Sequence, residues 1–150
     1  MRLRPIAVPP ILLAVVLMAP GACGQTTTSD TGDFQGAQKD VAEAVYDFRD
    51  AIAKRDEAKI CDAYLTAALR DEITRVAKSA DRGSTCAKAI EDSIQDIDAT
   101  DIEIPKGGIA ITGTTATVKV KTDLTDDPDP TDTLTLTDER GWRISKLPGG

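Results

Sequence analysis

The chain has 150 residues, of which 29% are charged and only 3% are aromatic, and its formal net charge is −7. This length fits one domain plus a processed segment. A protein that binds nucleic acid needs a basic face to neutralise phosphates, so the acidic balance argues against that class of protein.

The chain begins with the pattern of an export signal. Two arginines precede the apolar run "ILLAVVLMA" at Ile11–Ala19, and the small residues Gly21 and Ala22 follow it. A transmembrane helix is the alternative, but it needs about 20 consecutive apolar residues, and this run is much shorter. We therefore predict that residues 1–22 form a signal peptide that is removed on export.

Cys23 follows the small residues directly, and the ending "GAC" resembles the signal of bacterial lipoproteins. In that family the cysteine receives a diacylglycerol thioether, and an aliphatic residue usually stands where this chain has Pro20. The resemblance implies lipidation at Cys23 and attachment to the extracytoplasmic face of the cell membrane, which two acyl chains make stable. Ordinary cleavage after Ala22, which would give a secreted protein, is the alternative.

The segment from Gly24 to Gly36, "GQTTTSDTGDFQG", is polar and has no apolar period. Such a composition cannot bury a core, so residues 23–36 are predicted to be a flexible tether. A chain of this length spans roughly 20 Å, enough to hold a folded domain clear of a membrane. A frayed domain terminus is the alternative interpretation.

Cys61 and Cys86 remain as a pair if Cys23 carries lipid, and exported thiols tend to pair. A zinc site would need two further ligands, but the chain has no histidine and no other cysteine. The spacing of the pair is also not that of a C-x-x-C redox motif. The sequence therefore favours a structural disulfide.

Four helices are predicted after Gly36. The first carries Val41, Val45, Phe48 and Ile52 on one face, at the spacing of an α-helix. The predicted N-caps of the second, third and fourth helices are Asp56, Thr66 and Ser84. Their apolar faces are formed by Ile60, Cys61, Tyr64 and Leu65, by Leu69, Ile73 and Val76, and by Cys86, Ile90, Ile94 and Ile97.

The second half of the domain changes to the two-residue period of strands. The predicted strands are Ile109–Thr112, Ala116–Thr122, Asp132–Asp138 and Gly141–Leu147, and "DIEIP" before Gly107 is a candidate short edge strand. Gly113-Thr114 and Glu139-Arg140-Gly141 are the predicted turns. We predict an α+β domain over residues 37–150, with N-terminal helices packed on a curved antiparallel sheet of about four strands.

This order resembles the nuclear transport factor 2-like superfamily, also called SnoaL-like or cystatin-like, and especially its small exported lipoproteins. The stretches that carry the resemblance are "VAEAVYDFRDAIAKRD", "KICDAYLTAALRDEI" with "STCAKAI", and "TLTLTDERGWRISKL". It implies a conical half-barrel that encloses a pocket. The superfamily includes isomerases, cyclases and dehydratases as well as binding modules without catalysis, so the fold alone does not fix the function.

No catalytic residue, metal site or cofactor is predicted. The absence of histidine excludes Ser-His-Asp and Cys-His catalysis and histidine-ligated metals. Four aspartates cluster in "TDDPDPTD" at Thr125–Asp132, where Ca²⁺ could bind, but the spacing is not that of an EF-hand. A solvated acidic turn is the favoured interpretation of this segment.

Tyr46, Tyr64 and Trp142 are the candidate ligand-binding residues, because aromatic rings can line an apolar pocket. The predicted function is a lipid-anchored domain without enzymatic activity that binds a small apolar ligand or another cell-envelope protein. The alternative is an isomerase, cyclase or dehydratase acting on an apolar substrate. In such an enzyme Asp50 or Asp62 would be the base and Tyr46 or Tyr64 the hydrogen-bond donor.

Overall fold

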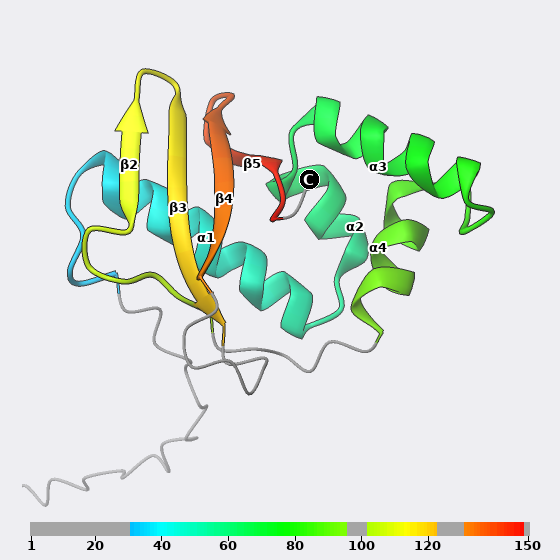
Figure 1. Ribbon diagram of the computed structural model, residues 1–150, viewed down its shortest axis with the longest axis horizontal. Coiled ribbons are helices and arrows are strands. Elements are labelled where there is room, and N and C mark those ends of the chain that lie inside the picture. Colours follow the sequence, from blue (N-terminus) through cyan, green and yellow to red (C-terminus); the bar gives the residue numbers. More distant parts are fainter. Residues whose placement is uncertain (1–30, 96–101, 123–130, 149–150) are drawn as a thin grey trace, which may run out of the picture.

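The computed structural model describes residues 31–95, 102–122 and 131–148, which form an α+β domain in which helices precede strands (Figure 1). The helices are α1 (Ala37–Ala53), α2 (Glu57–Lys59), the π-helix η1 (Ile60–Tyr64), α3 (Ala67–Ser79) and α4 (Cys86–Ile94). The strands are β1 (Ile102–Glu103), β2 (Ile109–Thr112), β3 (Thr115–Thr122), β4 (Thr131–Asp138) and β5 (Trp142–Lys146). The predicted α+β class with helices before an antiparallel sheet is confirmed, although the described residues form five strands rather than about four. The predicted starts of β3, β4 and β5 are each wrong by one residue.

The sheet is antiparallel and open, in the order β1-β3-β4-β5, and β2 pairs with β3 as well. Both β1 and β2 lie along the same edge of β3, since Ile102 pairs with Thr122 and Ile109 pairs with Val118. The connection between them turns at Gly108, whose N–H donates to the Pro105 carbonyl at 2.7 Å. A Cβ at Gly108 would lie 2.8 Å from that oxygen, so the close turn requires glycine.

The core lies between the sheet and α1, which crosses behind the strands in Figure 1. On β4, Leu134 and Leu136 are buried, whereas the threonines between and beside them are partly or fully exposed. The apolar stripe of α1 faces these residues with Val41 and Val45, which are fully buried. The alternation on the strand and the helical period on α1 therefore converge on one core.

The second helix differs from its prediction. Asp56 caps it as expected, because its side chain accepts a hydrogen bond from the Lys59 N–H at 3.1 Å. However, a single α-turn leads into the π-helix η1, and Leu65 is extended rather than helical. Leu65 forms a parallel bridge with Ile144, and the Thr66 N–H donates to the Ile144 carbonyl at 2.9 Å. The chain leaves the helix to pair with the open edge of β5.

The caps of the longer helices are side-chain oxygens. The Thr66 hydroxyl accepts from the Leu69 N–H at 3.3 Å and begins α3, as predicted. The predicted cap of α4, Ser84, is wrong. Thr85 has the extended backbone of an N-cap, and its hydroxyl accepts from the Lys88 N–H at 3.3 Å.

Phe34 corrects the predicted tether. It is only 6% exposed and belongs to the core cluster, so the expectation that residues 24–36 bury nothing is wrong at this position. Cys23, the signal sequence, Ile97 and the aspartates at 126, 127 and 129 lie outside the described residues. Within the described ranges, no helix has the length and apolar character needed to cross a bilayer.

Candidate functional site

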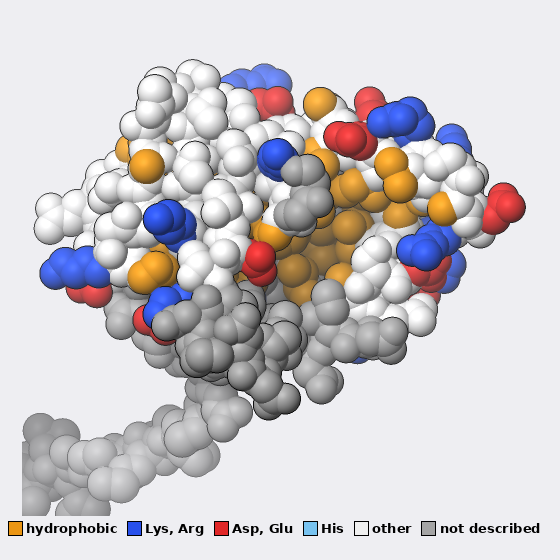
Figure 2. Space-filling model, viewed as in Figure 1, with side chains coloured by type: hydrophobic (Ala, Val, Ile, Leu, Met, Phe, Trp, Pro, Cys, Tyr) orange, Lys and Arg blue, Asp and Glu red, His pale blue; other side chains and the backbone are white. Residues whose placement is uncertain are grey.

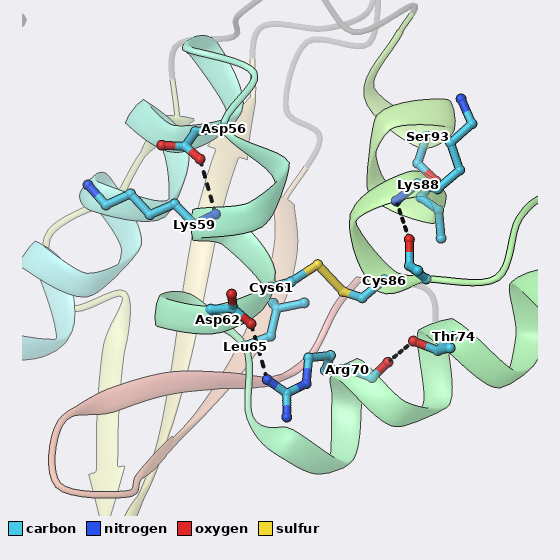
Figure 3. The surroundings of a disulfide bond; sticks show 12 residues. Asp56, Lys59, Cys61, Asp62, Leu65, Arg70, Thr74, Cys86, Lys88 and Ser93 are labelled. Atoms are coloured by element: carbon cyan, nitrogen blue, oxygen red, sulfur yellow. Dashed lines mark hydrogen bonds and ion pairs between the residues drawn. A yellow bond between two sulfur atoms is a disulfide. The ribbon is translucent and has the colours of Figure 1, made fainter.

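The predicted disulfide is present and joins Cys61 of η1 to Cys86, the first residue of α4 (Figure 3). Both cysteines are buried. The cross-link fixes the start of α4 against the body of the domain, while α3 and α4 also contact each other. It therefore holds one wall of the cleft described next.

An apolar cleft opens between α3, α4 and the end of β5. Figure 2 shows hydrophobic side chains gathered in a hollow at this place. The cleft has a volume of about 520 Å³. Its apolar lining consists of Leu69, Ile73, Val76, Ala77, Ala89 and Leu147. Such a volume and lining are typical of sites for small molecules.

A second apolar cavity of about 220 Å³, called the inner cavity below, lies between α4 and the sheet. Its walls include Phe48, Ile60, Ile90, Val120 and Leu134. Ser93 and Leu147 line both cavities, so the two spaces adjoin at these side chains. The apolar surface thus extends from the open cleft toward the sheet.

The charges at the cleft are Glu72, Arg82 and Lys146. The Glu72 carboxylate has a partner, because its Oε1 lies 3.9 Å from Nη2 of Arg75. Among the described residues, no acidic side chain forms an ion pair with Arg82 or Lys146. Within the part of the chain that the structure describes, the cleft therefore presents two cations without a direct acidic partner.

Lys88 lies beside the end of the cleft but is already engaged. Its ammonium group lies 3.0 Å from the Asp92 carboxylate and 3.1 Å from that of Glu91. Hydrogen bonds to Asp92 and then to Glu91 raise the pKa of Lys88 above its usual value. These contacts hold the ammonium group at α4, whereas no carboxylate of residues 31–95, 102–122 or 131–148 forms an ion pair with Arg82.

The three candidate aromatic residues do not line the apolar cleft. Tyr46 is buried, with the Arg49 guanidinium 5.1 Å from the centre of its ring. Tyr64 meets Phe48 edge to face, with ring centres 6.5 Å apart. Tyr64 and Trp142 instead share a separate, more polar cavity with several carboxylates. The structure thus brings two of the three together, but in a different place from the apolar cavities.

The two candidate bases also lie apart from the cleft. The Asp50 carboxylate is 2.8 Å from the Arg49 guanidinium, and that of Asp62 is 3.2 Å from Arg70. Neither aspartate lines a described cavity that also contains a tyrosine. Within the described ranges, no group of three histidine, cysteine or acidic side chains could hold a metal ion.

Sequence reasoning missed the small residues that make the cleft. Ala77 of α3 and Ala89 of α4 are buried and line it, and Ser93 follows one turn after Ala89. Small side chains on the faces of two neighbouring helices leave space between them. This pattern is visible in the sequence, but it becomes a signal only when α3 and α4 are known to be neighbours.

The sequence and the structure were compared with protein-family models, curated proteins and solved structures, and none of the three comparisons gives a match.

Proposed function

We propose that this protein is a lipid-anchored extracytoplasmic binding protein that holds a small apolar ligand in the cleft between α3, α4 and β5. The observation that carries the proposal is the cleft itself, which has a volume of about 520 Å³ and an apolar lining. Each methylene group that a ligand buries there gains about 0.8 kcal/mol. A ligand of modest size can therefore bind without catalysis or a metal.

We also propose that the domain is a member of the nuclear transport factor 2-like superfamily. The order of helices before an antiparallel meander supports this assignment, as does the way α1 covers one face of the sheet. The inner cavity lies between the sheet and the helices, where a cone of this superfamily would hold its ligand.

The proposed binding is tested by placing a charge in the cleft. Val76 lines the cleft but is 53% exposed, so Val76→Glu costs the fold little. A carboxylate there would lose hydration when a ligand covers it. We expect the affinity for the neutral apolar dye Nile red to fall at least about tenfold, measured by fluorescence titration of the exported full chain carrying Cys23→Ser.

Thr74→Glu is the matched control for that experiment. Thr74 is also β-branched and lies on α3, but it lines the opposite side of the helix and not the cleft. We expect its dye affinity to equal that of the parent protein. An equal loss in both variants, or no dye binding by the parent protein, would contradict the proposed site.

The proposed anchor makes a separate prediction. Replacing Cys23 with Ser removes the thiol that would receive the diacylglycerol, and the acidic domain has little attraction for anionic lipid. We expect the variant to move from the membrane fraction into the medium, measured by immunoblotting of both fractions. Retention of the variant in the membrane would contradict lipid anchoring, and recovery of the unaltered protein in the medium would favour plain secretion.

A further inference from the structure

We infer that the ligand of the cleft is an unbranched fatty acid, with its tail along the apolar lining and its carboxylate at Arg82. This inference rests on the proposed function and specifies the ligand class. Two features support it: the cleft and the inner cavity adjoin, and Arg82 and Lys146 line the cleft.

The shape favours one long chain over a compact ligand. The open cleft of about 520 Å³ and the inner cavity of about 220 Å³ adjoin at Ser93 and Leu147. Leu147, which lines both spaces, is partly exposed. An unbranched tail could start in the cleft, pass Leu147, and end against Phe48 and Val120 in the inner cavity.

Arg82 is the cation best placed for the head group. It lies in the turn after α3, where its backbone N–H donates to the Ala77 carbonyl at 2.9 Å and leaves the guanidinium out of this bond. The neighbours Asp81 and Gly83 both have positive φ, at 55° and 112°, so the turn has a defined shape. A guanidinium group can bind a carboxylate through two parallel hydrogen bonds. Arg82 has no acidic partner among the described residues.

Lys146 is less suitable because acidic charge lies near it. It lines a third, small cavity together with Asp132, which is also at the edge of the inner cavity. Asp132 therefore makes the surroundings of Lys146 less positive, whereas Glu72, the acidic residue of the cleft, is paired with Arg75. The tail end of the ligand carries no charge, so the proposed orientation keeps the anionic head away from this aspartate.

The test compares dodecanoate with dodecanol, two chains of equal length that differ in their head groups. Each is titrated against bound Nile red, with the exported full chain carrying Cys23→Ser. The titration is done at about pH 8, where the carboxyl group of the acid is ionised. We expect dodecanoate to bind about tenfold more tightly than dodecanol, because a charge-assisted hydrogen bond is stronger than a neutral one. Longer acids should bind up to about fourfold more tightly per added methylene until the cavities are full.

Arg82→Gln should abolish the preference for the acid, measured as the ratio of the dodecanoate and dodecanol affinities. Lys78→Gln removes one positive charge from the opposite side of α3, and Lys146→Gln removes one from the other end of the cleft. We expect both variants to keep the preference. All three residues are exposed, so the variants should fold, and their melting temperatures provide the check.

The outcomes separate this inference from the proposed function. Equal binding of acid and alcohol, loss of the preference in Lys146→Gln instead of Arg82→Gln, or affinity independent of chain length would overturn the fatty-acid assignment. In each of these cases dye binding that is sensitive to Val76→Glu would still support an apolar site. Failure of the dye and of both ligands to bind would overturn the inference and the proposed function together.

Discussion

Reduction of the Cys61–Cys86 disulfide is expected to lower the free energy of unfolding by about 3 kcal/mol and the melting temperature by about 10 °C. The two cysteines are 25 residues apart in the sequence. The bond therefore closes a loop in the unfolded chain and removes conformational entropy from it. Cys61 belongs to η1 and Cys86 to α4, and both are buried. The bond therefore also holds α4, one wall of the cleft, against η1.

Thermal unfolding followed by circular dichroism, with and without a reducing agent, measures this effect. Cys61→Ala, Cys86→Ala and the double variant all lose the same bond, so their melting temperatures should agree closely. Reducing agent should lower the melting temperature of the parent protein, whereas the melting temperature of the double variant should stay the same. A parent protein that melts at the same temperature in both conditions would show that the bond does not stabilise the domain.

The sequence predicts much of the fold because several local signals agree with the tertiary structure. The stripe of Val41, Val45 and Phe48 is buried as its period requires. Asp56 and Thr66 cap their helices. In each case the short-range preference and the long-range packing favour the same conformation, which is why local reasoning succeeds.

The prediction fails where a distant partner decides. Leu65 continues an apolar helical pattern, yet it is extended because Ile144, far along the chain, offers a strand edge. A second failure has a local cause. Ser84 and Thr85 are both good N-caps by residue type, and only the extended backbone at Thr85 shows which of them begins α4. Phe34 is one aromatic residue in a polar run, and only a nearby core gives it a place to pack.

The candidate site is harder to predict than the fold, because a cleft is formed where side chains are small and no particular residue type marks it in the sequence. Tyr46, Tyr64 and Trp142 are conspicuous in a chain with few aromatics, but aromatic rings mostly fill volume. The cleft instead depends on Ala77 and Ala89, whose small side chains leave volume between two helices. Finding it requires the packing of α3 beside α4, which the predicted disulfide does not define, because that bond joins η1 to α4.

Substitution of Leu136 by Ala is expected to lower the free energy of unfolding by about 3 kcal/mol, because the lost side chain leaves a cavity in the packed core. Leu136 is fully buried on β4, where it pairs with Ala116 of β3 and Ile144 of β5. It does not line the cleft or the inner cavity. We therefore expect stability to fall while the affinity for Nile red stays unchanged, as measured by urea unfolding and dye titration.

Thr137→Ala is the control, because Thr137 is the next residue on β4 and points to the opposite, partly exposed face. Its expected cost is below about 0.5 kcal/mol. The pair of variants tests the register of the sheet, since a shift of one residue would exchange the two side chains between core and surface. Equal losses of stability, or a larger loss for Thr137→Ala, would contradict the register that positions β5 beside the cleft. A loss of dye affinity in Leu136→Ala at urea concentrations below its unfolding transition would show that the core and the cleft are not independent. It would indicate that the dye binds against the core side of the sheet and not in the cleft.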